Sequence, residues 1–172
     1  MDKAMRREKI LEKIRQSKKP ISATLLAENF SVSRQVIVGD VALLRANGQD
    51  IIATARGYIM PETRDEHQYF KKIACCHTPE ETSSELYEIV DLKAIVIDVI
   101  VEHDVYGEII GQLNLKTRDD VDNFMLRVGQ SKVKLLSELT KGIHLHTVAC
   151  RDKEHFDIVE DRLKKCGYLL ND

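Results

Sequence analysis

The stretch GIHLHTVAC, residues 142–150, places two histidines two positions apart between branched apolar residues. Alternate side chains of a β-strand point to opposite faces, so His144 and His146 share one face while Ile143 and Leu145 share the other. Two imidazoles side by side on one strand favour a common partner for their nitrogens. We therefore work outward from this strand to the rest of the chain.

Strand and helix patterns alternate around this stretch. Strands are predicted at KKIACC (71–76), KAIVIDVIVEH (93–103) and YGEIIGQLNL (106–115), and helices at TPEETSSELYEIVDL (78–92), TRDDVDNFMLRVGQ (117–130), with residues 132–139 continuing helical, and DKEHFDIVEDRLKKCG (152–167). The expected inward stripes of the last two helices are Val121, Phe124, Met125 and Val128, then Phe156, Val159, Leu163 and Cys166. This β-α-β-β-α-β-α order predicts an α+β domain with a mainly antiparallel sheet and helices on one face.

The first 60 residues have a different pattern. Met5, Ile10, Leu11 and Ile14 recur at helical spacing, Ser22 and Ser33 can cap two further helices, and the apolar pairs 51–52 and 58–59 flank ATARG. Three helices with a tight turn between the second and third, followed by a hairpin, predict a winged helix-turn-helix. Charge divides the chain in the same way, because residues 1–60 carry 11 Lys and Arg against 6 Asp and Glu, whereas residues 61–172 carry 15 against 22. We expect a DNA-binding domain over residues 1–62 and a regulatory domain over residues 63–172.

SRQVIVGDVALLRANG, residues 33–48, resembles the recognition helix of bacterial winged-helix regulators. In such a protein this helix lies in the major groove, with Ser33, Arg34 and Gln35 nearest the bases and Val38 on the same side. Arg56, in the turn of the hairpin, would reach phosphate or the minor groove. The alternative is a helical bundle whose polar positions are simply solvated.

Cysteine content and hydropathy indicate where the protein works. The four cysteines, Cys75, Cys76, Cys150 and Cys166, are expected to be free thiols in a reducing cytoplasm. The longest apolar run is interrupted by Asp98, and the N-terminus has no apolar core. We therefore expect neither a signal peptide nor a membrane span.

Several polar residues do not fit a simple amphipathic pattern. Glu85 sits at the edge of the buried face of its helix, and His77 ends the strand just before that helix. Together with His144 and His146 they form a set that suits a divalent transition metal such as zinc or nickel. Cys75 and Cys150 are contenders for the same site. The alternative is that each histidine is an ordinary hydrogen-bonded strand residue.

His103 lies at a tight turn with Tyr106 and Gly107, and it is expected to share a strand face with Ile95, Ile97, Val99 and Val101. Imidazole, phenol and a backbone that a ligand can approach closely suit a small aromatic or carboxylated ligand. The alternative is a turn histidine whose nitrogens are satisfied locally.

The segments CCHTPEE (75–81), VEHDVYGEI (101–109) and GIHLHTV (142–148), behind a helix-turn-helix, resemble the three-histidine (3H) domain of the niacin-responsive repressors, the NiaR family. The resemblance covers essentially the whole chain. It implies a homodimeric repressor, not an enzyme, that binds operator DNA upstream of NAD biosynthesis or niacin uptake genes. Nicotinic acid would be its co-repressor, and each chain would hold one divalent metal.

Carried over by motif, the metal ligands are His77, Glu85, His144 and His146, and the effector lies by His103 and Tyr106. The family usually has proline after the middle histidine, where this chain has Asp104. Two other functions compete: a regulator for which the metal itself is the signal, and a metal-dependent hydrolase fused to a DNA-binding head.

Overall fold

The computed structural model describes residues 2–61 and 69–170. The chain divides into two compact units, residues 1–64 and residues 65–172, and each is described by itself. The expected domain boundary between residues 62 and 63 lies outside the described residues.

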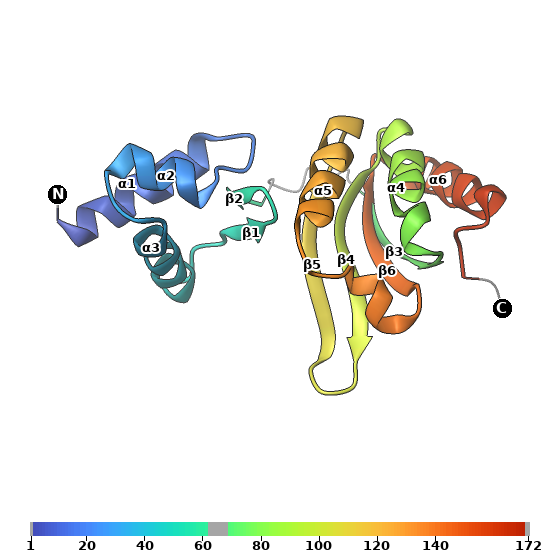
Figure 1. The fold of residues 1–172 in the computed structure, drawn as a ribbon. Helices are drawn as coiled ribbons and strands as arrows, with labels where there is room; N and C mark the ends of the chain where they lie inside the picture. Colours follow the sequence, from blue (N-terminus) through green and yellow to red (C-terminus); the bar gives the residue numbers. More distant parts are fainter. Residues whose placement is uncertain (1, 62–68, 171–172) are drawn as a thin grey trace. The chain divides into compact units, whose positions relative to one another are not determined.

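The first unit contains α1 (Lys3–Gln16), α2 (Ala23–Phe30), α3 (Arg34–Ala46) and the hairpin of β1 (Ile52–Thr54) and β2 (Gly57–Ile59) (Figure 1). The side chain of Ser22 accepts a hydrogen bond from the backbone N–H of Leu25, and that of Ser33 accepts one from Val36. Both predicted caps are therefore confirmed, as are the three helices and the hairpin. Ile21 pairs with Tyr58 and extends the hairpin by one bridge.

A small apolar core holds this unit together. Its fully buried side chains are Ile10, Ile14, Leu26 and Ile37. Charged contacts join the first and third helices: Asp40 is buried on α3, its Oδ2 lies 2.6 Å from Nε of Arg6, and its Oδ1 lies 3.7 Å from Nη1 of Arg7, both on α1. This pairing compensates the burial of the carboxylate and fixes α3 against α1.

The second unit is an antiparallel sheet covered by helices. Its strands β3 (Tyr69–Cys76), β4 (Ile95–His103), β5 (Gly107–Leu115) and β6 (Ile143–Cys150) are ordered β3-β6-β4-β5, and every neighbouring pair is antiparallel. Its helices are α4 (Thr82–Asp91), α5 (Arg118–Gln130) and α6 (Lys153–Cys166), with short 3-10 turns η1 (Pro79–Glu81) and η2 (Leu136–Thr140). The predicted α+β fold class and order of elements are confirmed.

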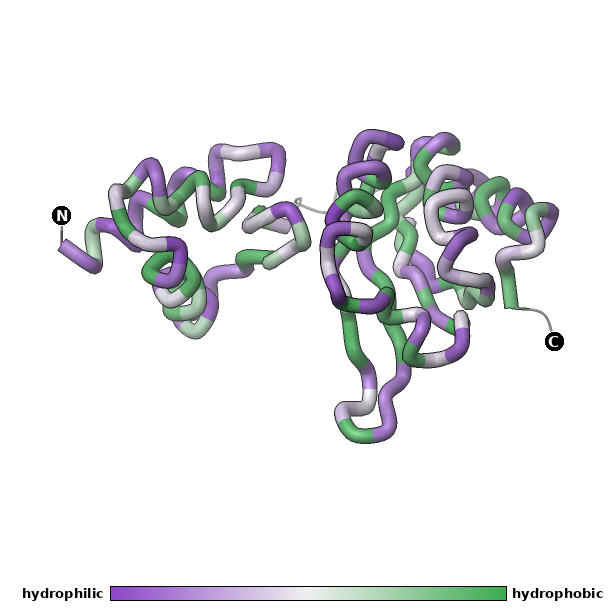
Figure 2. Tube along the Cα trace, in the orientation of Figure 1, coloured by the Kyte–Doolittle hydropathy of each residue, from purple (hydrophilic) through white to green (hydrophobic). Residues whose placement is uncertain are grey.

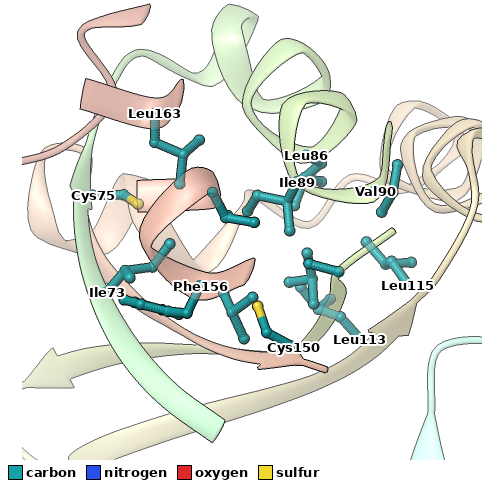
Figure 3. Packing of buried hydrophobic residues seen from close by; sticks show 14 of the residues in the cluster. Ile73, Cys75, Leu86, Ile89, Val90, Leu113, Leu115, Cys150, Phe156 and Leu163 are labelled. Atoms are coloured by element: carbon teal, nitrogen blue, oxygen red, sulfur yellow. The ribbon is translucent and has the colours of Figure 1, made fainter. Parts of the chain in front are cut away.

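The hydrophobic core lies between the sheet and the three helices. Leu86 and Ile89 of α4, and Phe156 and Leu163 of α6, gather against strand residues such as Ile73 (Figure 3). Hydrophobic and hydrophilic positions alternate along α6, as an amphipathic helix at the surface requires (Figure 2). On β6 the apolar core residues Val148 and Cys150 are followed, toward the start of the strand, by the buried polar residues His146 and His144 of the candidate site.

Two local expectations are wrong. Residues 132–139 do not continue α5, because Ser131 has extended backbone (φ −93°, ψ 150°) and the next helical turn is the 3-10 segment η2. Gly129 and Ser131 are weak helix formers, which explains the stop. Cys166 is exposed on the last turn of α6, because the buried stripe of that helix ends at Leu163.

A β-bulge changes the face of β4 half-way along the strand. Ile95 lies opposite Ala149 of β6, but after a register shift Ile100 lies opposite Leu145. One extra residue reverses the alternation, so His103 does not share a face with Ile95, and that expectation is wrong.

Candidate metal centre and nucleic-acid interface

A helix cap brings the first two candidate ligands together. The backbone N and Oγ1 of Thr78 donate hydrogen bonds of 2.9 and 3.1 Å to Oε2 of Glu81, and Pro79 occupies the first turn. This capping box turns the chain directly from β3 into η1 and α4. As a result Glu85, eight residues after His77, returns to it with its Oε2 2.9 Å from His77 Nε2.

The strand β6 supplies the other two residues on the face that meets α4. Nε2 of His146 lies 3.3 Å from Oε1 of Glu85, and Nε2 of His144 lies 3.6 Å from the same oxygen. All four side chains are buried, and Glu85 is 0% exposed. The structure therefore brings together the whole predicted set of His77, Glu85, His144 and His146, while metal binding itself stays a prediction.

The outer nitrogens of the three rings are held by the backbone. Nδ1 of His77 lies 2.8 Å from the carbonyl oxygen of Thr78, that of His144 lies 2.8 Å from Gly142 O, and that of His146 lies 2.6 Å from Asp98 O. A carbonyl oxygen can only accept, so each Nδ1 carries a proton. Each neutral ring then presents the lone pair of Nε2 to Glu85.

These donors fit a cation. Oε1 of Glu85 is buried and accepts no hydrogen bond, although two imidazole nitrogens lie near it. Ligands at about 2.0–2.1 Å from a tetrahedral zinc are about 3.3 Å apart, and the three Nε2 atoms lie 2.9–3.6 Å from a Glu85 oxygen. Among the described residues, the group whose ligand atoms all lie within 4.8 Å of one another is Cys75, Glu85 and His144. A metal bound here would supply the positive charge that these inward-facing lone pairs need.

Without a metal, protons must supply that charge. Burial raises the pKa of the Glu85 carboxyl, but the charge of His146 and hydrogen bonds from the three histidines hold it well below its ordinary value. Burial lowers the pKa of His77 and of His146, yet their contacts with Glu85 leave both pKa values raised. The carboxylate therefore remains charged in the interior and requires a cationic partner.

The two cysteine contenders lie in different surroundings. Cys75 is fully buried opposite His144, and its sulfur lies within 4.8 Å of ligand atoms of Glu85 and His144. Burial, and then the charge of Glu85, raises the pKa of the Cys75 thiol. Cys150 is six residues further along β6, about 20 Å from His144 at the rise of a strand, and packs in the hydrophobic core. Cys75 therefore stays a contender for the metal site together with Glu85 and His144, whereas Cys150 lies too far along β6 to join it.

Sequence patterns missed two residues that position the ligands. Asp98 sits in the bulge of β4, where its carbonyl accepts from His146 and its Oδ1 accepts a 2.9 Å hydrogen bond from the backbone N–H of Thr147. Gly142 has φ +95°, and a Cβ there would lie 2.4 Å from His77 O. The signal for Asp98 was a lone carboxylate within a buried apolar strand. The signal for Gly142 was a glycine two residues before the first histidine of β6.

His103 and Tyr106 lie at the tip of the β4–β5 hairpin (Figure 1). Their ring centroids are 5.2 Å apart, and Tyr106 is 76% exposed. Nδ1 of His103 accepts from the backbone N–H groups of Val105 and Tyr106 at 3.2 and 3.4 Å. This geometry favours the alternative of a locally satisfied turn histidine, and an effector role for the pair stays a prediction.

The expected DNA-reading residues occupy the start of α3. Ser33 caps the helix, Arg34 and Gln35 are exposed in its first turn, and Val38 is half-buried against the core of the unit. Arg56 is half-buried in the turn between β1 and β2, and its backbone N–H donates to Thr54 Oγ1. The side chains of Arg34 and Gln35 are thus free to contact base edges, whereas Val38 also has a packing role.

Comparison with known proteins agrees with both units. Residues 6–59 match an HTH domain, and residues 70–172 match the 3H domain. The transcription repressor NadR of Bacillus subtilis (strain 168) is 40% identical over 171 residues, which cover 98% of this chain and 95% of the relative. The chain belongs to the NiaR family of transcription repressors. The probable transcription repressor NiaR of Thermotoga maritima is 39% identical over 173 residues, covering 99% of this chain and 98% of the relative.

Membership of the NiaR family confirms the resemblance drawn from the three histidine segments. The relatives are named as repressors rather than enzymes, so the expectation that the chain is not an enzyme is also confirmed. All four cysteines are free, as expected. Within residues 2–61 and 69–170, none of the helices has the length and apolar character needed to cross a membrane.

Proposed function

We propose that this NiaR-family repressor acts in the cytoplasm as a homodimer on operators of NAD biosynthesis or niacin uptake genes, with nicotinic acid as co-repressor. Each chain binds one divalent transition metal, nickel or zinc, through His77, Glu85, His144 and His146. The observation that carries the metal assignment is the convergence of three imidazole Nε2 atoms on one buried carboxylate. Nitrogen and oxygen donors of this kind suit either ion.

DNA binding is supported by the exposed first turn of α3. Arg34 and Gln35 offer bidentate patterns to guanine and adenine edges, and Arg56 is placed in the wing. One small head makes few base contacts. A dimer with two heads doubles them on a two-fold related operator, which supports the homodimer.

The choice of nicotinic acid rests on the family and on charge. Its carboxylate would be attracted by the net positive charge of a metal-loaded centre nearby, and this attraction offsets part of the loss of hydration. Nicotinamide has no such charge and is expected to be a much weaker co-repressor. The resemblance places the ligand by His103 and Tyr106, but a tyrosine this exposed would shield little of it from water.

A titration of operator DNA with metal-loaded protein tests this function. Nicotinate is expected to raise operator affinity by about 5- to 150-fold, the usual range of coupling between two sites, and nicotinamide much less. Equal affinity with nicotinate, with nicotinamide and without ligand rules out the co-repressor. A response to metal alone, which the buried centre would allow, favours a metal-sensing regulator instead.

A further inference from the structure

We propose that a cavity beside His77 is the effector pocket and that it holds the carboxylate of a small aromatic acid between Lys134 and Lys141. This inference rests on the proposed function and places its ligand away from the hairpin of His103 and Tyr106. The cavity has a volume of about 470 Å³ and is lined by residues from the β3–α4 turn and from the segment around η2. That volume is within the ordinary range for pockets that bind small molecules.

The lysines in the lining have free charges. Among the residues that the structure describes, neither Lys134 nor Lys141 makes an ion pair or a side-chain hydrogen bond. The two acidic residues of the lining are already engaged. Glu81 accepts from Thr78, and Oε2 of Glu138 accepts a 2.7 Å hydrogen bond from the backbone N–H of Leu135. The free charged donors of the pocket are therefore two ammonium groups, which bind a carboxylate through charge-assisted hydrogen bonds.

The balance of charge in the lining limits the class of ligand. Two lysines face two fixed carboxylates, so the lining alone carries no net charge. A singly charged acid can sit against the lysines, whereas an anion with two or more charges would also be repelled by Glu81 and Glu138. A pyridine or benzene monocarboxylate meets this requirement, and Pro79 offers an apolar surface for its ring.

The wall of the pocket is built on the candidate metal ligands. Gly142 lines the cavity, its Cα packs against the backbone of His77, and its carbonyl oxygen accepts from Nδ1 of His144. A ligand that fixes the turn at Lys141 and Gly142 therefore fixes two of the four residues that would hold the metal. Ligand and metal are expected to strengthen each other's binding by the same factor.

Lys141 permits a charge-removing change that does not harm the fold. Its φ is +54°, in the left-handed region that glycine adopts without steric strain. In Lys141→Gly the midpoint of thermal unfolding is therefore expected to stay the same or rise. Lys134 is exposed, and Lys134→Met removes its charge while keeping the length of the side chain.

The test is a calorimetric titration of sodium nicotinate into zinc-loaded full-length protein. In the Lys134→Met/Lys141→Gly variant the affinity for nicotinate is expected to fall about 10- to 100-fold, the loss typical of hydrogen bonds to charged groups. Zinc content and the thermal midpoint are expected to match the parent, but nicotinate no longer raises zinc affinity. Tyr106→Ala, at the hairpin tip, is the matched control and is expected to bind nicotinate like the parent.

The other outcomes overturn different statements. Unchanged nicotinate affinity in the double variant, or its loss in Tyr106→Ala alone, overturns the pocket and leaves the co-repressor in place. If the zinc-loaded parent binds no nicotinate, the proposed co-repressor fails and the pocket assignment fails with it.

Discussion

In the helix-turn-helix unit Arg34 and Gln35, which are expected to read bases, are exposed, whereas in the 3H unit the four candidate metal ligands are buried. Arg34 and Gln35 extend from the first turn of α3 into solvent, and substitutions there change few contacts within the protein. Glu85 lies among three imidazoles, each held in place by a backbone carbonyl. Function and stability are therefore nearly separate in the first unit and tightly linked in the second.

The largest effect is expected from removing two ligands of the 3H unit together. In His144→Ala/His146→Ala, the metal bound by purified protein is expected to fall from about one ion per chain to near none, because metal affinity depends on ligand number. Elemental analysis after dialysis measures this, with the exposed hairpin variant Tyr106→Ala as control. Full retention of metal in the double variant would exclude this ligand set.

A smaller effect is expected when the support behind a ligand is removed. Asp98→Ala leaves the backbone N–H of Thr147 without its acceptor in the bulge that positions His146. Loss of such supporting contacts typically lowers metal affinity about 10- to 100-fold, and an unpaired buried donor lowers the free energy of unfolding by about 1–3 kcal/mol. Asp98→Asn keeps an acceptor oxygen for the N–H of Thr147. This variant is therefore expected to keep most of the metal affinity and most of the free energy of unfolding of the parent. If alanine and asparagine behave alike, the hydrogen bond to Thr147 has no positioning role.

In the first unit we expect substitutions of the DNA-reading side chains to change DNA affinity while the free energy of unfolding stays nearly the same. Arg34→Ala is expected to weaken operator binding by about 1–3 kcal/mol and to relax base preference at one position of each half-site. Arg56→Ala is expected to weaken binding to all sequences alike, since it would contact the backbone. Quantitative binding to operator and mutated operator duplexes separates the two patterns. Parent-like binding by both variants would mean that α3 and the wing do not contact DNA.

The smallest effect is expected at Gly39, inside α3. A Cβ at this exposed position would meet nothing within 4 Å, so alanine fits without any adjustment. Gly39→Ala is expected to raise the free energy of unfolding by about 0.5–1 kcal/mol, the usual difference between the two residues in a helix. Chemical denaturation measures the change. A decrease would show that the backbone at Gly39 is not free to take an ordinary helical residue.

Local patterns predicted most of this fold and the members of the candidate site. The alternation around His144 and His146, the cap at Thr78 and the position of Glu85 in its helix each depend on residues close in sequence, so they could be read directly. The proximity of Glu85 to both strand histidines depends on how α4 packs against the sheet, so sequence spacing alone could not predict it.

The errors came from features that periodicity cannot show. The bulge at Asp98 inserts one residue into β4 and moves His103 to the other face, although the spacing of the apolar residues on either side of Asp98 does not show the extra residue. Pairing with β6 decides that register. The role of Gly142 likewise depends on the backbone of His77, which is distant in sequence.

X-ray absorption spectroscopy of the zinc-loaded protein examines the candidate metal centre most directly. With His77, Glu85, His144 and His146 as ligands, the first shell is expected to contain only nitrogen and oxygen at about 2.0–2.1 Å, with the scattering pattern of three imidazoles. On this ligand set the Cys75→Ser variant is expected to give the same spectrum, although the sulfur of Cys75 lies within 4.8 Å of ligand atoms of Glu85 and His144. A sulfur shell at about 2.3 Å that disappears in Cys75→Ser, or a spectrum with fewer than three imidazoles, would contradict the proposed centre.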